Sequence, residues 1–246
     1  MKQLKWIAGL AVALSVSTSY AADIDSALIV DNYIGKGYHD DVKGDVNKYD
    51  TEKMIVSRTG SQITVDIYTN YTGSSIGDGG TGIGDLFMST NVLPIDAPWK
   101  PNSDNDTFED TNWNYAYKVY DADRKLQSGR GYLANNFDNG LVHTTSDSHR
   151  KGQVVSLDYN NLNRIGNVNN WSSDAQKISF SFNVAGTALE TANQIAFRWA
   201  MSCANDIIEG LVSVTDPNVT PVPEPETIAL FGLALAGLAY RRKQSS

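Results

Sequence analysis

The segment from Glu52 to Asn70, EKMIVSRTGSQITVDIYTN, alternates apolar and polar side chains on both sides of a glycine turn. Successive side chains of a β-strand point to opposite faces of a sheet, so this alternation is typical of strands with one buried face. Ile63, Val65 and Ile67 are expected to face the core, with the turn at Thr59–Ser61. The segment therefore predicts a hairpin of an antiparallel sheet.

Five further segments have the length and composition of strands. The segments between them show no strong helical period, and the chain has no repeat of fixed length. We therefore expect an all-β body, a single β-sandwich or jelly roll, over residues 22–215. The additional predicted strands are Gly84–Thr90, Trp113–Asp121, Gln153–Tyr159, Lys177–Gly186 and Asn193–Asp206.

Composition limits the classes of partner. The chain has 246 residues, of which 41% are hydrophobic, and a formal net charge of −8. It is long enough for one ordinary domain or two small ones, and its acidity disfavours binding to nucleic acid. An acidic body suits divalent cations or a neutral or cation-bridged polysaccharide, although acidity is also a common means of staying soluble. The single cysteine, Cys203, lies in an apolar segment and is expected to be buried.

The first 21 residues have the three parts of a secretory signal peptide. Lys2 and Lys5 precede an apolar run from Trp6 to Val16, and small residues lead up to Ala21. We predict export through the inner membrane and cleavage after Ala21 by signal peptidase. The alternative is a buried N-terminal helix.

The last 31 residues are predicted to form a linker over residues 216–222 and a terminal segment over residues 223–246. The uncharged run Ile228–Tyr240 is predicted to be a short transmembrane helix, although at 1.5 Å per residue it reaches only about 20 Å. Basic residues beside a membrane segment prefer the cytoplasmic side. Here the basic cluster is Arg241, Arg242 and Lys243.

Val222, Pro223, Glu224 and Pro225, followed by this apolar run and basic cluster, resemble the PEP-CTERM sorting signal. The resemblance implies recognition of Pro223, Glu224 and Pro225 by an exosortase, a membrane-embedded cysteine protease of Gram-negative bacteria that make exopolysaccharide. It also implies a membrane-anchored intermediate that ends at the cell surface or in the extracellular matrix. The alternative is a plain C-terminal membrane anchor.

The body carries a weaker resemblance. HDDVKGD, GDLFMST and WAMSCANDIIEG are similar to segments of exosortase-dependent surface proteins of unassigned function. The expected sandwich is also similar to carbohydrate-binding and DOMON-like domains. That similarity is one of architecture, and a fold alone does not fix a function.

Acidic loops suggest one ligand of the body. Asp40 and Asp45, or Asp104 and Asp106, provide carboxylates in flexible segments of the kind that bind calcium. No segment matches the EF-hand loop, and aspartates in turns usually cap their own backbone. A bound calcium ion is therefore an expectation, and no other cofactor is predicted.

Aromatic residues suggest a second ligand. Trp99 and Trp171 lie among Pro, Asn and Ser residues and are the predicted surfaces for stacking on sugars. Trp113, Tyr115 and Tyr117 are expected in the core or at its edge, and Trp199 in the core, because aromatic residues favour strands.

We find no catalytic motif in the sequence and expect a non-catalytic protein. The favoured function is association with exopolysaccharide in a biofilm. One alternative is a polysaccharide hydrolase with an unrecognised pair of carboxylates. The other is a structural coat protein that assembles with itself.

Overall fold

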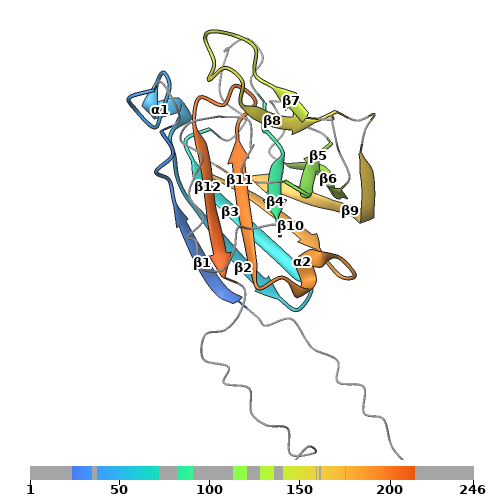
Figure 1. Cartoon of the computed structure of the whole chain (residues 1–246). Helices are drawn as coiled ribbons and strands as arrows, with labels where there is room; N and C mark the ends of the chain where they lie inside the picture. Colours follow the sequence, from blue (N-terminus) through green and yellow to red (C-terminus); the bar gives the residue numbers. More distant parts are fainter. Residues whose placement is uncertain are drawn as a thin grey trace, which may run out of the picture.

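One antiparallel sheet, bent until its first and last strands meet, forms most of the fold (Figure 1). The computed structural model describes residues 24–34, 38–71, 82–90, 113–120, 128–135, 141–158, 160, 162–174 and 176–213. Within these ranges ten strands form this sheet, each antiparallel to its neighbours. Their order is β1 (Ile24–Val30), β2 (Thr51–Thr59), β3 (Gln62–Thr69), β10 (Lys177–Asn183), β9 (Asn163–Ser173), β6 (Ser128–Asn135), β5 (Tyr115–Val119), β4 (Leu86–Ser89), β11 (Gln194–Ala200) and β12 (Ile207–Ser213).

The prediction of an all-β body is confirmed, but the sandwich needs a correction. A sandwich or jelly roll has two separate sheets, whereas these ten strands form one hydrogen-bonded sheet. The bend brings β12 against β1, where Ile29 packs over Gly210. A Cβ on Gly210 would lie 2.5 Å from Ile29 Cγ2, so the seam between the two strands needs a glycine. Alternation in single strands predicts buried faces and does not tell how many sheets share them.

The predicted hairpin is confirmed as β2 and β3. Ile63, Val65 and Ile67 are all buried in the core enclosed by the sheet. Gly60 turns the chain with a φ of +55°, which suits the first of the two central positions of a type II′ turn. The register pairs Thr59 with Gln62, so the turn is one residue shorter than predicted.

A second layer covers part of the outer face. Strands β7 (Leu141–His143) and β8 (Val154–Leu157) form a separate hairpin, and β8 packs on Phe87, Trp113 and Tyr132. The buried carboxylate of Asp85 joins the layers, because it accepts hydrogen bonds from Lys118 Nζ at 3.1 Å, Val119 N at 2.8 Å and Leu157 N at 2.7 Å. Burial raises the pKa of Asp85, and the nearby ammonium of Lys118 opposes that shift.

Of the remaining predictions, some concern residues that the structure describes and others concern residues outside them. Cys203 and Trp199 are buried in the core, as expected, together with Trp113, Tyr115 and Tyr117. The helices, α1 (Val46–Tyr49) and α2 (Ala188–Thr191), are short, and no helix among the described residues is long and apolar enough to cross a membrane. The predicted signal peptide, linker and terminal segment, 228–240 included, lie outside the described residues.

Candidate functional site

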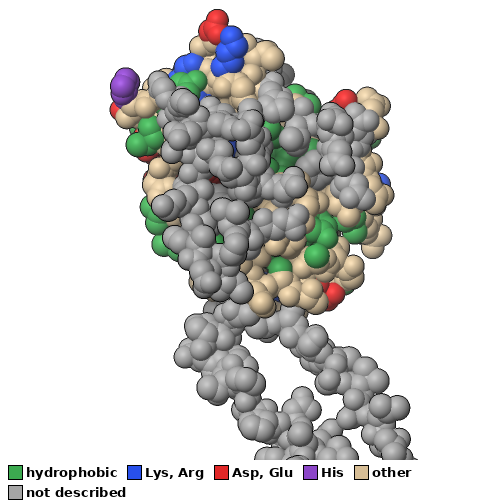
Figure 2. Space-filling view, in the orientation of Figure 1, with side chains coloured by type: hydrophobic (Ala, Val, Ile, Leu, Met, Phe, Trp, Pro, Cys, Tyr) green, Lys and Arg blue, Asp and Glu red, His purple; other side chains and the backbone are tan. Residues whose placement is uncertain are grey.

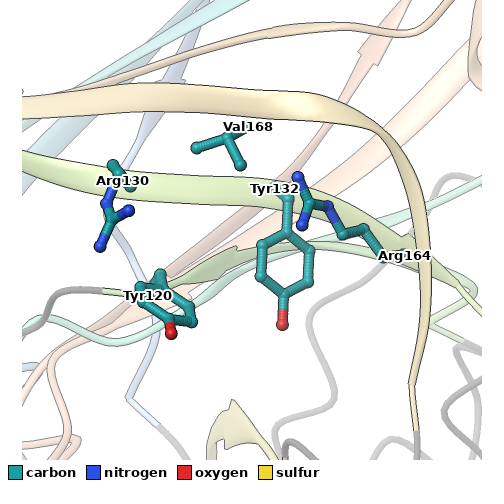
Figure 3. Close-up of a pocket in the computed structure, with 5 residues that line it drawn as sticks. All are labelled: Tyr120, Arg130, Tyr132, Arg164 and Val168. Carbon is teal, nitrogen blue, oxygen red and sulfur yellow. The ribbon is translucent and has the colours of Figure 1, made fainter.

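A hollow of about 180 Å³ opens on the outer face of the sheet, over β6 and β9 and the end of β5 (Figure 3). It lies beside the part of this face that the β7–β8 hairpin covers, since Tyr132 belongs to both. Five side chains line it: Tyr120, Arg130, Tyr132, Arg164 and Val168.

The register of the strands produces the hollow. Arg130 and Tyr132 are two residues apart on β6 and therefore share its outer face. Gly131 pairs with Asn169, and Leu133 pairs with Ile165. Between these two pairs the chain advances by two residues on β6 and by four residues on β9. The extra residues of this bulge include Val168, and a bulge is a common way to re-aim side chains beside a binding site.

Each arginine stacks on a tyrosine. The Arg130 guanidinium lies 5.1 Å from the centre of the Tyr120 ring, and the Arg164 guanidinium lies 5.0 Å from that of Tyr132. The Tyr120 N–H donates to Arg130 O at 2.8 Å, which brings the first pair together. Figure 3 shows the guanidiniums on either side, with the tyrosine rings between them. Such cation–π contacts are favourable and orient the guanidinium plane.

The two tyrosines differ in exposure. Tyr132 is buried, whereas half of the surface of Tyr120 is exposed, at 50%. Burial raises the pKa of Tyr132, the negative charge of Asp85 raises it further, and Arg164 lowers it. Tyr132 is therefore a neutral phenol at physiological pH. The site combines two positive charges with an accessible aromatic surface.

The residues predicted to stack on sugars do not form this site. Trp171 is 1% exposed, because alternation along β9 turns its ring into the core, and it pairs with Phe180 of β10. Its polar neighbours belong to the opposite face of a strand rather than to a loop, so the prediction of a surface tryptophan is wrong. Trp99 lies outside the described residues. The sequence signal that was missed is the alternation of Arg130 and Tyr132 in SGRGYLAN.

The guanidinium of Arg150 holds the loop that contains Asp40 and Asp45. Arg150 is fully buried and donates through its guanidinium to the main-chain oxygens of Ile34, Asp40 and Asp41. Asp45 instead caps α1 by accepting from Asn47 N at 3.1 Å.

One predicted calcium ligand, Asp45, therefore already uses a side-chain oxygen to cap α1. No group of three or more His, Cys, Asp or Glu residues in the described ranges is arranged to hold a metal ion. Asp104 and Asp106 lie outside those ranges.

A pair of carboxyl groups, Asp31 and Asp206, lies at the end of the body that carries α1. Asp206 is 0% exposed and accepts from Thr51 N at 2.6 Å and Ile207 N at 2.9 Å, and Asp31 accepts from Tyr33 N at 3.0 Å. Burial raises the pKa of both, and their mutual repulsion raises that of Asp206 further. Both carboxyls therefore keep their protons to a higher pH than an exposed aspartate does. Asp206 is enclosed, whereas Asp31 is half-buried at the same end of the body.

Comparison with known proteins identifies the terminal segment. Residues 221–243, which include Pro223, Glu224 and Pro225, match the PEP-CTERM protein-sorting motif, so the resemblance of the terminal segment to this signal is confirmed. The chain thus carries the mark of an exosortase substrate that is exported and sorted to the cell surface or the extracellular space. No curated protein and no solved structure matches the chain.

Proposed function

We propose that this protein is a non-catalytic component of the cell surface or extracellular matrix whose body binds exopolysaccharide. The sorting motif supports this location, because it is a signal for sorting to the cell surface or the extracellular space. The proposed route is the one expected from the sequence: cleavage by signal peptidase, anchoring by residues 228–240 in the inner membrane, and processing by exosortase.

The hollow between Tyr120 and Arg164 is the observation that carries the proposal. An aromatic ring with one accessible edge or face packs against the C–H groups of a sugar, and guanidiniums donate hydrogen bonds to its oxygens. The volume of the hollow, about 180 Å³, is smaller than the several hundred Å³ of pockets that enclose whole drug-sized ligands. The hollow therefore suits one sugar unit of a polymer that continues across the surface.

Co-sedimentation tests the proposal. The processed protein, purified from its host, is mixed with the host's cell-free exopolysaccharide, with and without calcium. We expect saturable retention and no new reducing ends. Absence of retention would remove the proposed function, and new reducing ends would establish the hydrolase instead. A requirement for calcium would support a site at the acidic loops, including the segment with Asp104 and Asp106.

Self-assembly is a second candidate, favoured by the outer face of β1. Leu28 and Val30 are 61% and 60% exposed there, and Figure 2 shows hydrophobic side chains along this side of the molecule. Replacing both residues with threonine keeps the strand propensity and removes the apolar surface. If the protein is a coat protein, light scattering will show assembly that rises with concentration and disappears in this double variant.

A further inference from the structure

We propose that the hollow selects the carboxylate of an acidic sugar, such as a uronic acid unit, within the bound polysaccharide. This inference rests on the proposed function and names the class of polymer.

The arrangement of the guanidiniums carries the inference. Arginine presents a planar fork of N–H donors that matches the two oxygens of a carboxylate, and such charge-assisted hydrogen bonds are stronger than neutral ones. Arg130 and Arg164 are both exposed, lie on adjacent strands and line the same hollow. Stacking on Tyr120 and Tyr132 limits the rotation of each guanidinium, which reduces the entropy lost when a ligand is bound.

One acid close to the hollow, Asp85, acts on Tyr132, but it is buried and paired with Lys118 at 3.1 Å. The chain as a whole has a net charge of −8, so it repels a polyanion at long range. Attraction to an acidic polymer must therefore come from a local cluster of cations, and charges farther away than about 8 Å are largely screened at physiological salt.

The remaining lining explains why the ligand would be a sugar rather than a free anion. The half-exposed ring of Tyr120 and the exposed side chain of Val168 provide apolar surface beside the cations. Figure 3 shows these two residues on opposite sides of the hollow. A sugar ring with a carboxylate substituent offers C–H groups to that surface and oxygens to the guanidiniums, whereas an inorganic anion makes only the second kind of contact.

Calorimetry with two matched probes tests the selection. The processed protein is titrated with the trimer of galacturonic acid and with the neutral trimer of galactose. We expect the acidic trimer to bind at least about tenfold more tightly, the ratio that one charge-assisted hydrogen bond supplies. Arg130→Gln and Arg164→Gln should each weaken binding of the acidic trimer by about tenfold and leave that of the neutral trimer nearly unchanged.

Two further variants separate charge from geometry and from folding. Arg164→Lys keeps the charge without the fork and should recover only part of the affinity that Arg164→Gln loses. Lys151→Gln removes an exposed cation that is bridged to Asp147 and does not line the hollow, so it should bind like the parent protein. Melting temperatures within about 2 °C of the parent show that each variant is folded.

Failure of this inference is distinguishable from failure of the proposed function. The host polysaccharide is tested before and after chemical reduction of its carboxylates to alcohols. Retention of the native polymer but not of the reduced one supports selection by the carboxylate. Equal retention of both, or retention unaffected by the two glutamine variants, overturns the inference and leaves polysaccharide binding in place. Retention of neither polymer overturns the proposed function itself.

Discussion

The buried carboxyls of Asp31 and Asp206 make the free energy of unfolding depend on pH. Both pKa values are raised in the folded protein, so between pH ~4 and those values the folded state holds more protons than the unfolded state. Stability is then lost as the pH rises through this window. Asp41 adds to the repulsion on Asp31, and Arg150 offsets part of it.

Replacing Asp31 with asparagine should relieve this loss. An amide imitates the protonated carboxyl, keeps an oxygen for Tyr33 N and offers N–H groups to Asp206. The melting temperature of Asp31→Asn should match that of the parent near pH 4 and exceed it by a few degrees at pH 8, equivalent to about 1 kcal/mol or more. Thermal unfolding from pH 4 to pH 8 measures the difference. A constant difference across this range would show that the pKa of Asp31 is not raised by folding.

A second residue-scale prediction concerns Asp85. It receives hydrogen bonds from three groups in the two layers, and Lys118 is its buried counter-ion. Asp85→Asn removes the negative charge and should lower the free energy of unfolding by about 3–5 kcal/mol, since one member of a buried pair is then left without its opposite charge. Urea unfolding gives this value. The double variant Asp85→Asn with Lys118→Met should recover part of it, and no recovery would show that the charge pair is not the cause.

At the scale of the strand, the seam between β1 and β12 depends on the contact of Ile29 with Gly210. Gly210→Ala adds a Cβ 2.5 Å from Ile29 Cγ2 and should destabilise the fold by about 1–3 kcal/mol through overpacking. Ile29→Ala in the same chain removes the clashing atoms, so the double variant should be more stable than the sum of the single effects predicts. A double-mutant cycle in urea measures this coupling. If the effects of the two substitutions on the free energy of unfolding simply add, the two residues are not in contact.

The strands also show which parts of the fold can be predicted from the sequence. Apolar alternation, or the length and composition of a strand, predicts β2, β3, β4, β5, β8, β10 and β11, because each buries at least one face. In contrast β9, NRIGNVNNWSS, is exposed along most of its length and gives no apolar period. The sequence therefore does not predict that Trp171 lies on a strand with its ring in the core, and it does not predict the bulge that shapes the hollow. Pairing between distant strands, as between Arg130 and Asn170, is decided by the fold of the whole chain and leaves no local pattern.

For the molecule as a whole, both ends of the body lie on one side. β1 begins and β12 ends at the same end of the sheet, as expected for antiparallel neighbours (Figure 1). The opposite end carries α1 and the loop of residues 144–153, and Figure 2 shows basic and acidic side chains together at its tip. If residues 228–240 anchor the chain in the membrane, as proposed, the first end should face the membrane and the second should point away.

Cysteine labelling tests this orientation, because the natural thiol, Cys203, is buried and gives little background. Lys151→Cys places a thiol at the far end, and Ala185→Cys places one in the exposed turn after β10, at the near end. In cells that lack exosortase, a bulky maleimide should label the first variant several times faster, since the membrane excludes the reagent from the near end. After release in detergent the two rates should converge. Equal rates before release would mean that the linker, residues 216–222, lets the body rotate freely, and that the direction in which the hollow faces is not fixed by the anchor.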